Sequence, residues 1–487
     1  MSGDWGALLP EMVIAVGGLG LLVFPWIKSP RLLGFITLSF LAAAFDIKMV
    51  AVLRQQRISE SLFNGMLLQD QFSAFFQLII LVSMGLVVLS LMGYSREEAR
   101  ARRELYALLL LVTVGLLILV GAQNFALIYV GLETVSLLSY LLTGFLKKDS
   151  LAVEGALKYF LFGSLATGAF LYGISLIYGL TGTMDLALLG GLFPKVMMEN
   201  PALGTLSILL LVVGLGFKVA LVPFHMWAPD AYEGAATPVT AFLSVGPKLA
   251  GFAVLSRVFL EGFSAAVGVW PVLLGWLAVL TMTLGNVVAL VQTNVKRMLA
   301  YSSTAHAGTM AIGLAVATPL GLTATLYYLV AYLLMNIGAF VGVIAVGNAA
   351  GREDIGAFAG LSRREPFLAL MITISFLSLA GIPPMAGFFA KMWIFGAAVK
   401  ARAFPLAVAA AANSVIAFFY YVKVVKSMYL DPAPAGAPRL PRSRALWLGL
   451  VVCTVSLFIV GLMPGPWLTF AADAIPFVLK TKSLPWM

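Results

Sequence analysis

Long apolar stretches alternate with short polar segments along almost the whole chain. A helix needs about 20 apolar residues to span the hydrocarbon core of a membrane. The pattern therefore predicts an all-α polytopic membrane protein with about fourteen helices, with twelve or thirteen as the alternative count. The sixth, eleventh and twelfth are long enough to be tilted or broken. The predicted helices are residues 7–27, 31–53, 71–93, 105–121, 124–146, 152–180, 204–226, 236–260, 270–292, 297–317, 319–347, 366–398, 404–428 and 446–469.

Two groups of five predicted helices repeat each other, the fourth to eighth and the ninth to thirteenth, with starts roughly 165 residues apart. Because five is an odd number, the second group is inverted in the membrane relative to the first. The fourth helix of each group contains proline, at Pro223 in one and at Pro383 and Pro384 in the other. A single such proline is an ordinary kink. Interrupted helices at matching places of inverted repeats, however, are typical of a transport site.

The repeat divides the chain into four parts. Residues 1–104 hold the first three helices, 105–261 the first repeat, 262–430 the inverted second repeat, and 431–487 the last helix and the tail. The N-terminal segment carries Asp4 and Glu11 in place of the basic residues of a signal peptide, so we expect no cleaved signal.

The composition supports a membrane protein and excludes a large soluble one. Of the 487 residues 61% are hydrophobic and 11% are charged, whereas soluble domains carry about 25% charged residues. The net charge of +10 is explained by the positive-inside rule, so we expect no nucleic-acid partner. Alternate loops hold 18 and 8 basic residues, which predicts that the richer side is cytoplasmic and that both termini face outward. One predicted cytoplasmic loop, residues 227–235, departs from this rule because it holds only Asp230 and Glu233.

Five charged residues lie inside the predicted spans: Glu133, Lys158, Lys218, Lys248 and Lys391. A charge at bilayer depth costs about 2.5–3.5 kcal/mol on insertion scales. Membrane proteins keep such residues mainly to move ions or protons, or to pair charges between helices. Several of the five lie beside a proline or glycine that interrupts a helix, which favours transport.

Each of these residues has a candidate role in proton transfer. A lysine in a low-dielectric environment gives up its proton more readily than one in water. We therefore expect Glu133 and Lys218 to act as a switch, in which the amine stays charged beside the carboxylate and becomes a better donor when the two separate. Lys248, which follows Pro247, is the candidate central relay, and Lys391, just past the second break, is the candidate exit. The alternative for each is a structural ion pair or a bond to a helix-end carbonyl.

Two further residues are less specific. Lys158 lies some seven residues into the sixth predicted helix and can either join the path or extend to the surface. His306, in the segment from Tyr301 to Gly308, suits proton relay because its unperturbed pKa is near neutrality, and the neighbouring Ser-Ser-Thr run is able to hold water. A buried histidine with a purely structural role is an equally good interpretation.

The sequence offers no means of redox or phosphate chemistry in this chain. It has neither a GxxxxGK[ST] phosphate loop nor a GxGxxG motif after a strand. Its two histidines exclude a multi-histidine metal site, and the single Cys453 excludes a disulfide framework and a cysteine-ligated iron–sulfur cluster. We expect no cofactor or metal in this chain.

Several motifs resemble the antiporter-like membrane subunits of bacterial NADH–quinone oxidoreductase (respiratory complex I), and more specifically those of the subunit N type. Two of them read Pro223-Phe-His-Met-Trp-Ala-Pro-Asp-Ala-Tyr-Glu-Gly234 and Gly381-Ile-Pro-Pro-Met-Ala-Gly-Phe388. The others are residues 159–166, 171–183, 237–244 and 294–303. The similarity covers about residues 5–470, and one departure is Ala236, where the motif has proline.

The resemblance implies fourteen helices with two inverted five-helix repeats and broken seventh and twelfth helices. It places the family's glutamate of the fifth helix on Glu133 and its lysines of the seventh and eighth helices on Lys218 and Lys248. The family's ionisable residue of the twelfth helix falls on Lys391.

The function implied is that of a proton-translocating subunit of a translocase whose NADH, FMN, iron–sulfur and quinone chemistry lies in other subunits. The partners would be other membrane-arm subunits, the lipid bilayer, protons and water, in the cytoplasmic (inner) membrane of a bacterium. A subunit of a multisubunit cation/proton antiporter is the alternative, since the wider family includes such proteins. A scaffold whose charges are structural pairs is the third interpretation.

Overall fold

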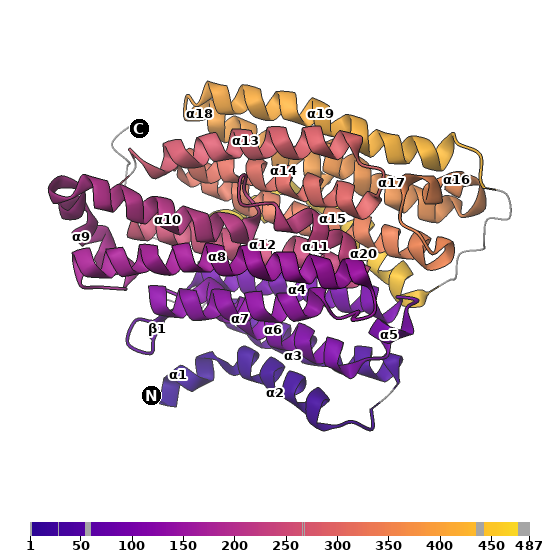
Figure 1. Cartoon of the computed structure of the whole chain (residues 1–487), viewed down its shortest axis with the longest axis horizontal. Coiled ribbons are helices and arrows are strands. Elements are labelled where there is room, and N and C mark those ends of the chain that lie inside the picture. The colour runs from indigo at the N-terminus through magenta and orange to yellow at the C-terminus, as the bar shows by residue number, and fades with distance from the viewer. Residues whose placement is uncertain are drawn as a thin grey trace.

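The computed structural model describes residues 2–27, 29–53, 60–264, 266, 268–434 and 443–475. Within these ranges the chain is a bundle of long helices that run side by side (Figure 1). The predicted tail falls largely outside the described residues. So do seven of the basic residues used to predict orientation: Lys28, Arg54, Arg57, Arg439, Arg442, Lys480 and Lys482.

The N-terminal part forms a layer of helices with a small hairpin that the hydrophobic pattern did not predict. Asp70 caps α4, because its side chain accepts a hydrogen bond from the backbone N–H of Ser73 at 2.8 Å. The hairpin pairs β1 with β2 in antiparallel register, with Glu60 opposite Gln69. The elements are α1 (Ser2–Ala7), α2 (Leu9–Val23), α3 (Pro30–Leu53), β1 (Glu60–Leu62), β2 (Leu67–Gln69), α4 (Gln71–Met92) and α5 (Glu97–Arg100).

The first predicted repeat contains one helix that the pattern missed, α9, between the predicted sixth and seventh spans. Its elements are α6 (Arg103–Gly121), α7 (Phe125–Thr143), α8 (Ser150–Thr181), α9 (Leu186–Glu199), α10 (Pro201–Val219), α11 (Trp227–Gly234), α12 (Thr237–Arg257) and the π-helix η1 (Val258–Gly262).

The second predicted repeat and the C-terminal part complete the bundle. Their elements are α13 (Trp270–Val291), α14 (Val295–Ala315), α15 (Pro319–Ala350), the 3₁₀ helix η2 (Ile355–Phe358), α16 (Leu361–Arg364), α17 (Pro366–Ala380), α18 (Ala386–Lys400), α19 (Phe404–Tyr429), α20 (Arg444–Leu462) and α21 (Pro464–Asp473).

The two helix breaks predicted from the prolines are confirmed. The seventh predicted span, residues 204–226, contains α10 and the break that follows Val219. The next helix, α11, occupies residues 227–234, where the pattern wrongly predicted a loop. The twelfth predicted span is divided into α17 and α18. Each first half ends where a residue takes a left-handed backbone conformation, Ala220 with φ 60° and Gly381 with φ 90°. The sixth and eleventh spans, α8 and α15, are each a continuous helix of 32 residues.

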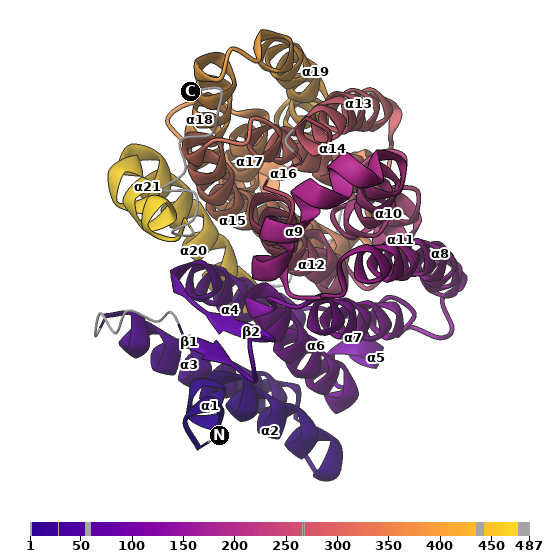
Figure 2. The ribbon, with the colours of Figure 1, turned by 90° about the vertical axis from the view of Figure 1, so that its left-hand side faces the viewer.

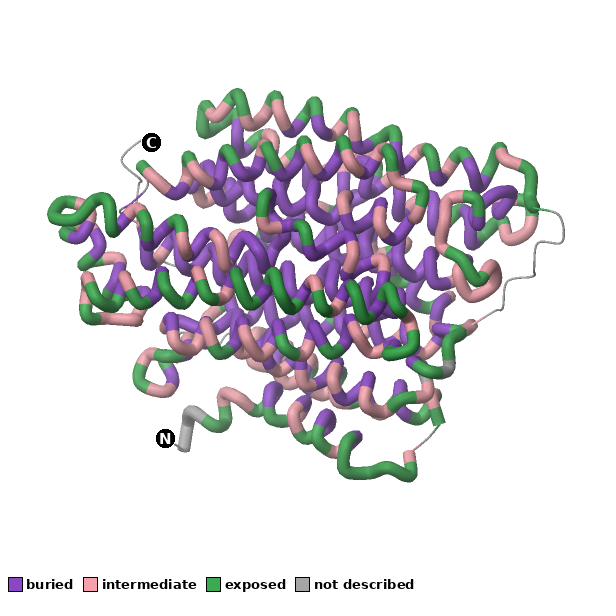
Figure 3. Tube along the Cα trace, viewed as in Figure 1, coloured by how far each residue is buried: buried purple, intermediate pink, exposed green. Residues whose placement is uncertain are grey.

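Eleven helices of the described residues are long and apolar enough to cross a membrane. The shorter apolar helices α2 and α17 are not among the eleven, nor is α14, and the count of fourteen stays a prediction. In α12 and α15 the most apolar stretch of the helix is fully buried. In α3, α8 and α19 only a minority of the residues in that stretch are buried. The view along the bundle places α12 and α15 inside (Figure 2), and the side view shows the buried residues concentrated in the middle of the bundle (Figure 3).

The second break depends on a close approach at Gly387. A Cβ atom at this position would lie 1.9 Å from the backbone oxygen of Ser378, so α17 and α18 would have to move apart. We expect Gly387→Ala to destabilise the protein by about 1–3 kcal/mol, the usual effect of overpacking. Thermal unfolding of the purified assembly measures this. The matched control on the same helix is Gly396→Ala, where the added atom meets nothing within 4 Å. Equal stability of the two variants would contradict the prediction.

Candidate functional site

The first part of the predicted path joins α7, α8 and α10. Glu133 on α7 is half-buried, and its carboxylate accepts a hydrogen bond of 2.6 Å from Thr167 on α8. Lys218 lies buried in the last turn of α10 and donates to the Ser136 hydroxyl at 3.0 Å. Ser136 is one helical turn beyond Glu133, so the amine and the carboxylate approach the same stretch of α7.

The predicted direct pair between Glu133 and Lys218 is not formed. Among the ion pairs of the described residues none joins these two side chains, because Ser136 and Thr167 take up their hydrogen bonds. The carboxylate nevertheless lies one helical turn from Ser136, the residue to which the amine bonds. This arrangement corresponds to the separated position of the predicted switch.

Backbone groups freed by the first break find partners in neighbouring helices. The N–H of Val222 donates to the Thr281 hydroxyl of α13 at 3.0 Å, and the indole of Trp227 donates to the carbonyl of Phe217 at 3.1 Å. A break inside a membrane is tolerated only where such partners exist. The break is therefore a fixed structure that holds Lys218 at a helix end.

Lys248 lies in the fully buried α12, one turn before Gly251. A Cβ atom at Gly251 would lie 3.6 Å from Cγ of Lys218, so the side chain of Lys218 passes within one helical turn of Lys248. Lys248 donates to both the carbonyl and the hydroxyl of Ser303 on α14. The central lysine is thus bonded to α14 while it lies next to the lysine of α10.

Hydroxyl groups surround the amine of Lys248. The Ser303 hydroxyl is 2.8 Å from that of Tyr332 and 3.3 Å from that of Tyr232. Tyr232 also donates to the carbonyl of Leu243 at 3.3 Å. In the helix this carbonyl would accept a hydrogen bond from the N–H of residue 247, but Pro247 has no N–H. Sequence analysis identified the serine run but missed these tyrosines, since a tyrosine in an apolar helix gives no sign of what its hydroxyl will meet.

His306 is buried between two tyrosines from different helices. Its Nδ1 lies 2.7 Å from the hydroxyl of Tyr328 on α15, and its Nε2 lies 3.0 Å from that of Tyr421 on α19. Tyr421 also bonds to Ser302. A neutral imidazole donates through one nitrogen and accepts through the other, so this row of groups is able to pass a proton by exchanging the two roles.

Lys391 lies at the second break and donates to the last carbonyls of α17. Its amine is 3.1 Å from the oxygen of Leu379 and 2.8 Å from that of Ala380. The bond to a helix-end carbonyl, which is the alternative to a transfer role for each buried lysine, is therefore present at Lys391. The lysine side chain also passes close to Gly381, where α17 ends. A Cβ atom at this position would lie 2.8 Å from Cδ of Lys391, so glycine is required there.

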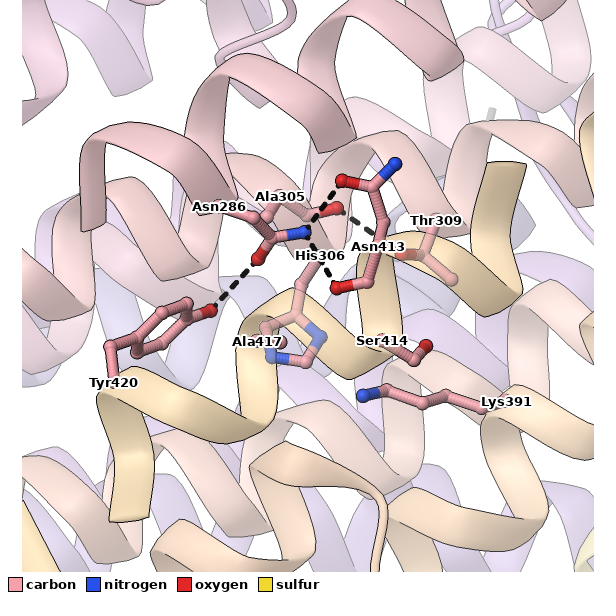
Figure 4. A pocket seen from close by; sticks show the side chains of 9 residues that line it. All are labelled: Asn286, Ala305, His306, Thr309, Lys391, Asn413, Ser414, Ala417 and Tyr420. Carbon is pink, nitrogen blue, oxygen red and sulfur yellow. Dashed lines mark hydrogen bonds between the residues drawn. The ribbon is translucent and has the colours of Figure 1, made fainter. Parts of the chain in front are cut away.

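A small cavity joins His306 to Lys391 (Figure 4). It has a volume of about 10 Å³, which is about the size that one water molecule occupies. Residues of α13, α14, α18 and α19 line it, and their polar side chains are Asn286, His306, Thr309, Lys391, Asn413, Ser414 and Tyr420.

Lys158 lies apart from this row. Its side chain is 40% exposed and forms ion pairs with Glu154 at 2.6 Å and with Asp230 at 2.8 Å. Asp230 and Glu233 in turn bind Arg297 of α14, at 2.6 and 2.8 Å. Residues 227–234 form α11 rather than a loop, and this network explains why the segment is acidic: its carboxylates neutralise basic residues of α8 and α14.

The structure therefore separates the six predicted site residues into two sets. Lys218, Lys248, His306 and Lys391 are buried and follow one another across α10, α12, α14 and α18, with the half-buried Glu133 at one end. Lys158 belongs to the ion network instead. The part of the chain that the structure describes brings together no group of three or more His, Cys, Asp or Glu that would hold a metal ion.

Comparisons with known proteins agree with this architecture. Residues 122–417 match the family described as "NADH:quinone oxidoreductase/Mrp antiporter, TM". NADH-quinone oxidoreductase subunit N of Trichlorobacter lovleyi is 39% identical over 476 residues, which is 97% of each chain.

Two solved structures share the fold. A chain of respiratory complex I from Thermus thermophilus matches with a TM-score of 0.79 and 34% identity, over 95% of this chain and 100% of that one. A chain of the Mrp complex from Dietzia sp. DQ12-45-1b matches with a TM-score of 0.80 over 96% of each chain. Its identity is only 23%, so this last likeness concerns the fold alone.

Proposed function

Because this chain belongs to the NADH:quinone oxidoreductase/Mrp antiporter family, we propose that it is a proton-translocating membrane-arm subunit of an NADH–quinone oxidoreductase. Electron transfer from NADH through FMN and iron–sulfur clusters to quinone takes place in other subunits and drives proton movement through this one. The chain is then part of a translocase, with other membrane-arm subunits as its partners. Its proposed place is the cytoplasmic membrane of a bacterium, with both termini on the outer side.

One observation carries this proposal: buried amines and an imidazole form a row from α10 to α18, and hydroxyl groups lie between them. Lys248, Ser303 and Tyr332 make one polar group, and Tyr328, His306 and Tyr421 make the next. Neighbours of this kind transfer protons over short steps. Apolar residues at these positions would lower the free-energy cost of inserting the helices into the membrane, since each charge at this depth opposes insertion.

The proposed sequence of events begins at Glu133. When its carboxylate approaches Lys218, the ammonium form of the lysine is stabilised, and when the two separate the amine releases its proton. The proton passes from the Lys218 ammonium toward the Lys248 amine, then through the hydroxyl groups of Ser303 and Tyr332 to the group around His306, and finally reaches Lys391. Each amine returns to its starting form once it has given its proton onward.

The same geometry argues against a metal cation as the transported ion. Beyond Glu133 the ionisable side chains of the row are amines and one imidazole, and a protonated amine repels a cation in a low-dielectric environment. Hard cations need several oxygen ligands, whereas the amines here use up the nearby hydroxyl and carbonyl oxygens. The likeness to the Mrp complex therefore favours a shared fold and gives no support for sodium transport.

Replacing Lys218 tests the proposal directly. In membrane vesicles that contain the assembled complex, we expect Lys218→Met to lower the number of protons pumped per electron by about tenfold or more, because proton transfer loses a positioned group. The rate of NADH oxidation by an artificial acceptor should be unchanged, since that reaction takes place elsewhere. Lys218→Arg keeps the positive charge, but the guanidinium group does not release its proton, so this variant should be similarly impaired. A normal ratio of protons to electrons in both variants would overturn the proposed function.

A further inference from the structure

Two asparagines lie at bilayer depth on neighbouring helices, Asn286 on α13 and Asn413 on α19. Both are buried, with side chains 4% and 6% exposed. The amide nitrogen of Asn286 donates to the side-chain oxygen of Asn413 at 3.1 Å and to its backbone oxygen at 3.2 Å. Tyr420 donates to the amide oxygen of Asn286 at 3.0 Å, and Asn413 donates to Thr283 and Ala409. Both amides are therefore fixed in orientation.

The two amides line the cavity that contains Lys391 and His306 (Figure 4). An ammonium group has three N–H donors, and Lys391 uses two of them on the carbonyls of Leu379 and Ala380. The third is free to bond within the cavity. Both ring nitrogens of His306 lie next to tyrosine hydroxyls, so a proton moves between Lys391 and His306 only through an intermediate group.

A single water molecule fits this requirement. The cavity, at about 10 Å³, holds about one, and a bridging water is nearly as good as a direct hydrogen bond. The side-chain oxygens of Asn286 and Asn413 each accept one described hydrogen bond and keep a second lone pair. An amide neither gains nor loses a proton at physiological pH, so the contribution of the two asparagines is to orient the water molecule.

We propose that Asn286 and Asn413 are positioning residues that hold the water through which Lys391 and His306 exchange a proton. In this step the imidazolium of His306 gives a proton from one ring nitrogen, whose tyrosine partner turns aside, to the water, and the water gives one of its own protons to the neutral amine of Lys391. The products are a neutral imidazole, an ammonium and an unchanged water. The inference rests on the proposed function, because it concerns one transfer within the same row.

Asn413→Leu tests this role in vesicles that contain the assembled complex. The leucine fills a similar volume and removes the amide, so we expect the protons pumped per electron to fall by about tenfold, the scale of loss when a reacting group is misplaced. Asn413→Asp keeps the oxygen that accepts from Asn286. It should recover part of the pumping with a pH profile moved to higher pH, because a carboxylate near Lys391 favours its ammonium form.

The matched control is Asn348→Leu. Asn348 on α15 is also an amide with two described hydrogen bonds, to Gly93 and Ser95, but it lies outside the cavity. Loss of this amide should change neither the ratio of protons to electrons nor the pH profile. If the asparagines only hold helices together, the asparagine variants will lower the amount of assembled complex while leaving the ratio and the profile of the remainder unchanged, which would overturn the positioning role.

The two possible failures are distinguishable. If Lys218→Met pumps normally, the proposed function is wrong and this inference is rejected with it. If Lys218→Met loses pumping but Asn413→Leu keeps the wild-type ratio, only the positioning role is rejected. Should leucine at residue 413 prevent assembly, Asn413→Asp decides: a displaced pH profile supports the role, and a wild-type profile overturns it.

Discussion

A complex that carries Lys248→Met is expected to oxidise NADH with an artificial acceptor at the normal rate and to lose nearly all proton translocation. Lys248 lies in the centre of the buried row, in a helix whose most apolar window is fully buried. Among the residues that the structure describes, Lys248 is the basic side chain that bonds to Ser303. Because the amine lies between Lys218 and the hydroxyl groups of α14 and α15 in the proposed path, we expect a loss of at least about tenfold.

Folding of the Lys248→Met variant should be preserved, which makes the measurement clean. Methionine has a similar length, and the Ser303 hydroxyl keeps its contacts with Tyr332 and Tyr232. Removal of a buried charge also removes a cost of insertion. The measurement is acidification or quenching of a pH-sensitive dye in vesicles, normalised to electrons transferred.

The matched control for this lysine is Lys195→Met. Lys195 lies on α9 with its side chain 75% exposed and pairs only weakly with Glu199, at 3.7 Å. Its replacement should leave pumping unchanged. A Lys248→Met complex that pumps as well as Lys195→Met would show that the central lysine is structural, as a scaffold would require.

Replacement of Glu133 by glutamine is expected to depress coupled proton transport while the peripheral redox reaction stays intact. The amide oxygen of glutamine is still able to accept the hydrogen bond from Thr167, so the local structure is kept. What is lost is the negative charge that acts on Lys218. Without it, the switch has no carboxylate to approach the amine, and we expect a reduction of about tenfold in protons per electron.

The control for the glutamate is Glu199→Gln, which removes an exposed carboxylate from α9. Both variants lose one negative charge, but only Glu133 lies beside the row. Normal stoichiometry in Glu133→Gln would count against a role for this residue and would move the start of the path to Lys218.

Several structural features followed from local sequence. The prolines at 223, 383 and 384 correctly predicted two helix breaks, because proline removes a backbone hydrogen bond of the helix. Proline alone does not decide a break, since α12 continues through Pro247 and α9 through Pro194. The bond of Lys391 to the last carbonyls of α17 corresponds to the structural alternative given for each buried lysine, and its role as the exit stays a prediction. By contrast, α9 and the hairpin at β1 and β2 were missed, since short elements outside the apolar stretches carry no strong periodic signal.

The pairing of charges was predicted least well. Glu133 and Lys218 were predicted to form a switch that pairs and separates, and the structure has the two groups apart, bonded to Thr167 and Ser136. The place of Lys158 was decided by Asp230, a residue 72 positions away. Tyr328 and Tyr421 were not predicted at all, although they bond to both nitrogens of His306.

The sequence by itself determined that this protein lies in a membrane, where its helices break, and which ionisable residues fall within apolar stretches. Apolar length and proline are local properties, so a single chain displays them. Only the tertiary structure decided which side chains meet, since Lys248 and Ser303 are 55 residues apart and His306 and Tyr421 are 115 apart. Hydrogen bonds act over about 3 Å and depend on direction, so the partners of each charge are fixed by how the helices pack.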